Sequence, residues 1–183
     1  MNDNVIAAEP NQILYATNVK SVNDPAAPQQ WGVSMVDAES VWPVSTGEDV
    51  TVAVLDGAFL PDHPDLAGRM MPGYDFIDND FDVEADPTLT NHHGTHVAGI
   101  IAANRNNNTN IVGVAPQATV MPLRVLSDCM CGTVSDIING LRYAAQLPNS
   151  TGTIPAQAAK VANLSIQFPY GESVALKSSL EAV

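Results

Sequence analysis

Apolar and polar positions follow one another along the chain in blocks that predict strands and helices in turn. One short run is almost continuously apolar, which is typical of a strand buried on both faces of a sheet, and two further runs also predict strands. Three others have the small apolar composition or the spacing of packed helices. Strands that alternate with helices form βαβ units, so the predicted fold class is α/β with a parallel sheet. The predicted strands are residues 50–56, 118–126 and 159–166, and the predicted helices are residues 95–103, 134–146 and 173–183.

Polar segments separate these elements and mark where they begin. Residues 1–30 are rich in Asn, Pro, Ala and Gln and predict an extended arm, whereas residues 61–92 and 104–110 predict loops. A further short helix is predicted at residues 33–42. The candidate caps are Ser34 or Asp37 for this helix, and Ser135 or Thr133 for the helix at 134–146.

The composition fits one acidic domain that is long enough to bury a core. The chain has 183 residues, 45% of them hydrophobic, and its 7 basic and 20 acidic residues give a formal net charge of -13. This charge argues against nucleic acid as a partner, because a nucleic-acid-binding face is basic. No apolar run approaches the roughly 20 residues that span a membrane, so no membrane partner is predicted.

The two cysteines, Cys129 and Cys131, are separated only by Met130. A disulfide between such close neighbours would be strained, so we expect free thiols, or a bond from one of them to another segment. Two thiolates alone are also too few for a zinc site. The cysteines therefore do not indicate a cellular compartment.

Candidate chemistry gathers at the end of the first strand and at the start of the first long helix. Asp56 ends the apolar run at 50–56, and sites in parallel sheets form beyond the carboxyl ends of the strands. His92, His93 and His96 precede or open the helix, and histidine transfers protons near neutral pH. A zinc site on His93 and His96 is an alternative, but helical zinc pairs are spaced four residues apart with a glutamate beside the first.

Three stretches match one protein family in their order and spacing. They are "VAVLDG" with "HPDLAG", then "HGTHVAGIIAA", then "GVAP", and "RVL" and "VANLS" continue the match. In these motifs the chain resembles the subtilisin-like serine proteases (subtilases, peptidase family S8) from about residue 23 to its end, most closely the secreted, thermitase-like bacterial branch. The resemblance implies export from the cell and an Asp-His-Ser triad, in that chain order, on a subtilase-type sheet.

The resemblance assigns roles to the aspartate and the histidines. Asp56 orients the imidazole, and His93, the first histidine of "HGTH", is the general base. His96 is a structural helix residue in the family, and His92 stands where the family has a small or polar residue. The family usually has Ser or Thr and then Gly after its aspartate, but this chain has Gly57 and Ala58. The hydroxyl that helps to hold the aspartate is therefore missing.

The nucleophilic serine has no counterpart in the sequence. The family places it in a Gly-Thr-Ser-Met-Ala-x-Pro segment, and no such segment follows His93. "GVSM" contains Ser34, but it precedes the aspartate and lacks the following Ala-x-Pro, so we reject Ser34 as nucleophile. By resemblance, residues 1–20 are the tail of a propeptide, and residues 21–183 are the N-terminal part of a catalytic domain. The isolated chain is predicted to be inactive, with its own propeptide and the C-terminal half of the domain as partners.

The resemblance also implies a site for an extended polypeptide substrate. Leu126 to Gly132 would line one side of the peptide, and Ser165, Ile166 and Gln167 the other, so that the peptide adds as a strand between them. The family usually has Ser-Leu-Gly at the second segment, so Gln167 would narrow or reshape the pocket there. The alternative interpretation of both segments is ordinary strand ends.

Calcium is the predicted cofactor, because the family's strong calcium site has counterparts here. Asp65 and Asn107 would supply side-chain oxygens, and Asp24 matches a further ligand. A weaker second site is predicted from the acidic stretch "DFIDND", for which an acidic loop without metal is the alternative. Asn104, Thr109 and Ile111 would add backbone carbonyls to the first site, and Asp75, Asp78 and Asp80 would form the second.

Two other functions remain open at this point. The altered Asp56-Gly57-Ala58 and the absent serine favour a non-catalytic member of the family that binds peptide or calcium. The near-intact "HGTHVAGI" disfavours it, because a non-catalytic chain has no physical need for His93. The other alternative is a metal-dependent hydrolase that uses the histidines; a zinc chelator would abolish its activity and a serine inhibitor would not.

Overall fold

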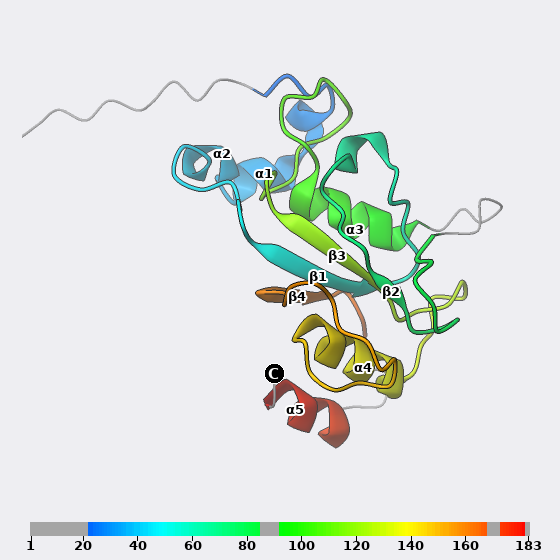
Figure 1. Ribbon diagram of the computed structural model, residues 1–183. Coiled ribbons are helices and arrows are strands. Elements are labelled where there is room, and N and C mark those ends of the chain that lie inside the picture. Colours follow the sequence, from blue (N-terminus) through cyan, green and yellow to red (C-terminus); the bar gives the residue numbers. More distant parts are fainter. Residues whose placement is uncertain (1–21, 85–91, 168–172, 182–183) are drawn as a thin grey trace, which may run out of the picture.

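The protein, described here by a computed structural model over residues 22–84, 92–167 and 173–181, contains a four-stranded parallel sheet in the order β2-β3-β1-β4. Figure 1 shows helix α3 on one face of this sheet and helices α4 and α5 on the other. The predicted α/β fold is confirmed. The strands are β1 Thr51–Asp56, β2 Tyr74–Asp75, β3 Thr119–Arg124 and β4 Val161–Leu164; the helices are η1 Ala27–Gln29, α1 Trp31–Met35, α2 Ala38–Val41, η2 Pro64–Leu66, α3 His93–Ala102, α4 Val134–Ala144 and α5 Val174–Glu181.

Strand β1 lies inside the sheet, between β3 and β4, and all of its residues are buried. Its side chains alternate between two cores, as a strand covered on both faces requires. Val52 and Val54 pack in the core beneath α3, while Ala53 and Leu55 pack in the core beneath α4. The continuous apolar run read from the sequence therefore identifies the strand that carries Asp56 at its carboxyl end.

The helices on the two faces begin in different ways. Helix α4 begins with a capping box: the Thr133 hydroxyl accepts a hydrogen bond from the Asp136 N–H, and the Asp136 carboxylate accepts one from the Thr133 N–H. Thr133 and not Ser135 is thus the N-cap. Helix α3 has His92 at its N-cap and no side-chain cap. Its N-terminus is instead fixed by tertiary contacts, which are described below.

The predicted helix at residues 33–42 is two short helices, α1 and α2. Asp37 interrupts it with a φ of 52°, in the left-handed region that short polar residues tolerate best. Asp37 precedes α2 as its N-cap residue, one of the two positions expected from the sequence.

The prediction of free cysteines is wrong, because Cys129 and Cys131 form a disulfide. Met130 has a φ of 55°, and this left-handed residue turns the chain so that the two cysteine Cα atoms are 5.3 Å apart, an ordinary separation for a disulfide. Hydrogen bonds close the same turn, from the Met130 N–H to the Ser127 carbonyl and from the Ser127 N–H to the Cys131 carbonyl. The apolar and polar pattern gives no sign of such a turn.

Candidate active site

Asp56 is held at the carboxyl end of β1 by its own backbone and by the strand beside it. The N–H groups of Val125 and Leu126, which follow β3, donate to the Asp56 carbonyl at 2.8 and 3.1 Å. Its Oδ1 accepts a hydrogen bond from the Gly57 N–H at 2.7 Å, and the residue is fully buried. The carboxylate therefore has little freedom to turn away from the site.

His93 is the first residue of α3 and contacts Asp56 directly. Its Nδ1 lies 2.7 Å from Asp56 Oδ1; the His93 side chain is 41% exposed and that of Asp56 is 0% exposed. Beside an ionised carboxylate the Nδ1–H donates, so Nε2 keeps its lone pair. This pair, which we call the dyad, places a partly exposed imidazole in front of a buried carboxylate, as a serine protease triad requires.

Two contacts fix the N-terminus of α3 beside β1. Gly94 approaches the following segment so closely that a Cβ atom there would lie 2.9 Å from the carbonyl oxygens of both Gly57 and Ala58. Thr95 Oγ1 accepts a hydrogen bond from the Leu60 N–H at 2.9 Å. The two residues after His93 thus set the distance between its ring and Asp56. Sequence inspection did not single out either residue, although both belong to the "HGTH" motif.

Substitution of Gly94 tests this close approach. Gly94→Ala is expected to destabilise the chain by about 1–3 kcal/mol, because the added methyl meets two backbone oxygens that cannot move independently. Gly99→Ala is the matched control in the same helix, since its Cβ would meet only Ile111 Cδ1 at 3.4 Å. There the better helix propensity of alanine should leave stability equal or up to about 1 kcal/mol higher. Urea unfolding of both variants measures the difference, and equal effects would contradict the proposed packing.

Gly57 and Ala58 differ from the Ser or Thr and Gly that the family has after its aspartate, but the dyad is still formed. Ala58 is not among the described residues with a positive φ, so its side chain costs no backbone strain where the family has glycine. Position 57 has no hydroxyl, and the neighbouring Asp56 Oδ2 is buried and has no hydrogen-bond partner among the described residues. Among the described residues, the Asp56 carboxylate thus accepts hydrogen bonds through Oδ1 and not through Oδ2.

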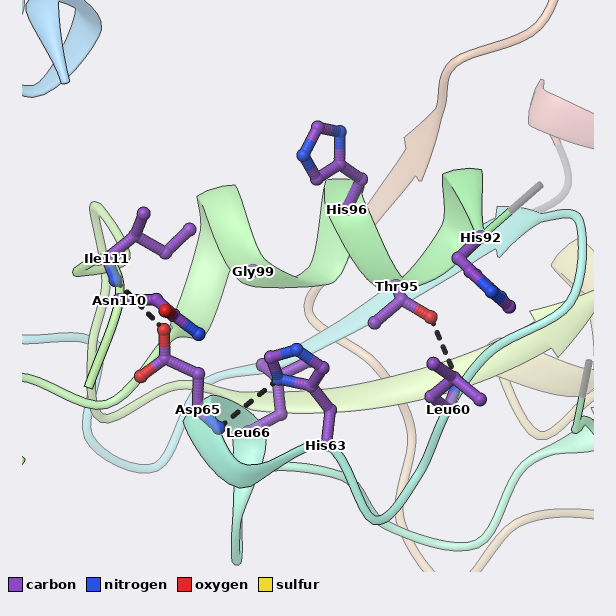
Figure 2. Close-up of a pocket in the computed structure, with 10 residues that line it drawn as sticks. All are labelled: Leu60, His63, Asp65, Leu66, His92, Thr95, His96, Gly99, Asn110 and Ile111. Atoms are coloured by element: carbon purple, nitrogen blue, oxygen red, sulfur yellow. Dashed lines mark hydrogen bonds between the residues drawn. The ribbon is translucent and has the colours of Figure 1, made fainter. Parts of the chain in front are cut away.

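The other two histidines of the motif belong to a separate pocket of about 320 Å³ beside α3. Figure 2 shows His92 and His96 extending from the helix in different directions, with His63 on the facing segment. His93 is not part of this lining, so His93 and His96 serve different features of the fold. Within the described ranges, no three His, Cys, Asp or Glu side chains are grouped to hold a metal ion. The structure therefore gives no support to the zinc alternative.

The predicted peptide-lining segments flank the dyad. Leu126 to Gly132 follows β3, Ser165 to Gln167 follows β4, and β1 with Asp56 lies between these two strands. Leu126 and Ile166 pack against the core, whereas Gly132, Ser165 and Gln167 are exposed. Because the strands are parallel, both segments leave the sheet at the edge where Asp56 stands. The two segments therefore follow the strands on either side of β1.

The residues of the first predicted calcium site converge on one loop. The Asp24 carboxylate accepts hydrogen bonds from the N–H groups of Asn106 and Asn107, and Asp65 accepts them from the Asn107 side chain and the Ile111 N–H. Asp24 and Asp65 are 2% and 1% exposed, and neither pairs with a cationic side chain in the described residues. Asn104 and Thr109 belong to the same loop: the Asn104 N–H donates to the Asp65 carbonyl, and the Thr109 N–H to the Asn107 side chain.

The second predicted calcium site is an ion-pair cluster instead. The Arg124 guanidinium lies 2.6 Å from Asp75 and 3.1 Å from Asp78, and its other amino group lies 2.9 Å from Asp128. Asp80 faces elsewhere, with its carboxylate accepting from the Asp82 N–H. Burial lowers the pKa of Arg124, but the hydrogen bond to Asp75 and the surrounding carboxylates outweigh it and raise the pKa overall. The neighbouring strand thus supplies a cationic side chain to Asp75 and Asp78, which favours the alternative of an acidic loop without metal at this position.

Comparison with known proteins identifies the family. Residues 47–180 match the Peptidase S8 subtilase family. The chain belongs to the subtilases. It is 39% identical over 152 residues to thermitase from Thermoactinomyces vulgaris, and the match covers 82% of this chain and 50% of thermitase. This subtilase chain is also 45% identical over 118 residues to an intracellular serine protease from Paenibacillus polymyxa. That match covers 63% of the chain and 35% of the Paenibacillus protein.

The solved structures agree with this assignment. A protease from Pseudoalteromonas arctica matches with a TM-score of 0.78 at 33% identity, over 87% of this chain and 55% of that one. The subtilase chain therefore spans about half the length, or less, of the relatives it matches.

Proposed function

We propose that this chain is part of a serine endopeptidase that hydrolyses extended polypeptides. The observation that carries the proposal is the contact of 2.7 Å between His93 Nδ1 and the buried Asp56 carboxylate, in a member of a serine protease family. In the reaction, His93 Nε2 would take the proton of a serine hydroxyl as its oxygen attacks the peptide carbonyl, and return that proton to the leaving amine. Asp56 would hold the ring and stabilise the imidazolium formed in between.

The serine is proposed to lie outside these 183 residues, in a C-terminal half of the catalytic domain. Two uncovered surfaces support a further partner of this kind. The second half of helix α3, residues 97–102, contains only glycine and apolar residues, yet Ile100 is 55% exposed. Strand β4 pairs only with β1 among the described strands, and Val161 on it is 51% exposed. A domain half that covers both surfaces would bring its serine towards the start of α3.

The proposed division of the triad predicts how the isolated chain behaves. Purified residues 1–183 should show no peptidase activity and no labelling by a serine-directed phosphonate, because the nucleophile is missing. Adding the C-terminal half of thermitase, as a probe, should produce a complex on size-exclusion chromatography and phosphonate labelling of that half. Inhibitor-sensitive peptidase activity from residues 1–183 alone would overturn the proposal.

A non-catalytic, peptide- or calcium-binding role is the second candidate. It is favoured by the absence of a hydroxyl at Gly57 and by Asp56 Oδ2, which has no partner among the described residues. A parent protein that binds peptides but fails to react with the phosphonate would establish it. The intact dyad favours catalysis, because peptide binding alone has no use for a base beside a buried carboxylate.

Calcium is the proposed structural cofactor, bound by Asp24, Asp65 and Asn107 with carbonyl groups of their loop. Two buried carboxylates without a cationic side chain suit a hard divalent ion, which prefers oxygen ligands. Export from the cell is also proposed, although the relatives include both extracellular and intracellular proteases. No helix within the described ranges is long and apolar enough to cross a membrane.

A further inference from the structure

Met130 is the one inward-facing residue of an otherwise exposed turn. Met130 is partly buried and packs against the core shared with α4, whereas the remaining residues from Asp128 to Thr133 are all exposed. The disulfide between its two neighbours and its left-handed φ of 55° hold the backbone of the turn in place. The direction of the Met130 side chain is therefore a property of the closed turn.

The Met130 thioether lies over Gly57, the residue next to Asp56. Its Sδ is 3.0 Å and its Cε 3.6 Å from the position that a Cβ atom on Gly57 would occupy. The Gly57 carbonyl in turn contacts the start of α3 at Gly94, beside His93. Met130 thus occupies space next to the dyad that a side chain at position 57 would otherwise fill, and it reaches there from a proposed peptide-lining segment.

We propose that Met130 determines substrate specificity by forming the wall of the peptide site next to the Asp56–His93 dyad. The proposal rests on the endopeptidase function proposed above. A peptide that adds as a strand beside Leu126–Gly132 presents alternate side chains towards the sheet edge, and the one nearest the dyad meets Met130. Glycine, alanine or serine fits there without displacing the thioether. Leucine, phenylalanine or methionine has to push Met130 off Gly57, which disfavours those substrates.

The test is a cleavage profile of the active parent protease with peptide libraries varied at one position at a time. For Met130→Ala, kcat/KM is compared between peptides that carry leucine and peptides that carry alanine at one position of the cleavage sequence. This leucine-to-alanine ratio should rise about tenfold or more, because the smaller side chain enlarges the pocket. Met130→Val should give a smaller rise, and Met130→Leu almost none, so that selectivity follows side-chain volume. Met35→Ala, which removes a methionine that is 74% exposed on α1, is the control and should leave the ratio unchanged.

The outcomes separate this inference from the proposed function. Parent protein that the phosphonate does not label contradicts the endopeptidase itself. Full labelling, with ratios that do not follow residue size in the valine and leucine variants, overturns the role of Met130 and leaves the endopeptidase intact. Reduction of the Cys129–Cys131 disulfide gives an independent readout, because release of the turn should broaden the preference at the same position. A broadening at a different position, or at none, counts against the proposal.

Discussion

Replacing His93 with alanine in the parent protease is expected to lower kcat by about 10⁴-fold or more, because the serine then has no base. His93 Nε2 is the nitrogen of the ring that can take the serine proton, since Nδ1 contacts Asp56 at 2.7 Å. Asp56→Asn should cause a loss of similar size, because an amide at this position favours the wrong tautomer of the ring. Hydrolysis of a chromogenic peptide, with phosphonate titration of active sites, measures both losses.

His96→Ala is the matched control for this experiment. It removes the same side chain from the same helix, three residues further on, but His96 is exposed and lines the separate pocket. Its effect on kcat should be less than tenfold. Equal losses in the His93 and His96 variants would mean that the base has been misidentified. The double variant Asp56→Asn, His93→Ala should lose little more than either single one, since the two residues act as a unit.

The sequence could predict the fold and the position of Asp56 because both follow from short-range patterns. The apolar run at 50–56 is continuous since β1 is covered on both faces, and Asp56 ends the run at the strand terminus. Short-range patterns could not identify His93 among the three histidines, because their spacing does not say which one faces the strand. The family motif made the choice, and the contact with Asp56 supports it.

The features that the sequence did not predict depend on contacts between distant residues or on unusual backbone angles. Arg124 takes the place expected for a second calcium ion, but it lies 49 residues from Asp75 and reaches it only because β2 pairs with β3. The Cys129–Cys131 disulfide depends on the left-handed Met130, a residue type that seldom adopts this angle. The helix at 33–42 is broken for the same kind of reason at Asp37.

Removal of calcium is expected to lower the melting temperature of the chain by roughly 5–10 °C. A ligand present at about one hundred times its Kd adds about 2.7 kcal/mol to the free energy of unfolding, and about 1 kcal/mol shifts the melting temperature of a chain of this size by roughly 2–4 °C. The physical reason is the pair of buried carboxylates, Asp24 and Asp65, which both accept N–H groups of the loop at residues 106–111 and have no cationic side chain beside them in the described residues. Thermal unfolding followed by circular dichroism, in millimolar calcium and after EGTA, measures the shift.

Variants of the carboxylates show where the ion acts. Asp65→Asn should abolish the difference between calcium and EGTA, since it removes a charged ligand that reaches both Asn107 and Ile111. Asp24→Asn should reduce the difference, whereas Asp78→Asn should keep it in full, because Asp78 belongs to the Arg124 cluster. A calcium effect that survives in Asp65→Asn but is lost in Asp78→Asn would place the ion at the second cluster. Because Arg124 already neutralises that cluster, such a result would require the guanidinium to leave the Asp75 carboxylate, which is 1% exposed and bonded to it at 2.6 Å.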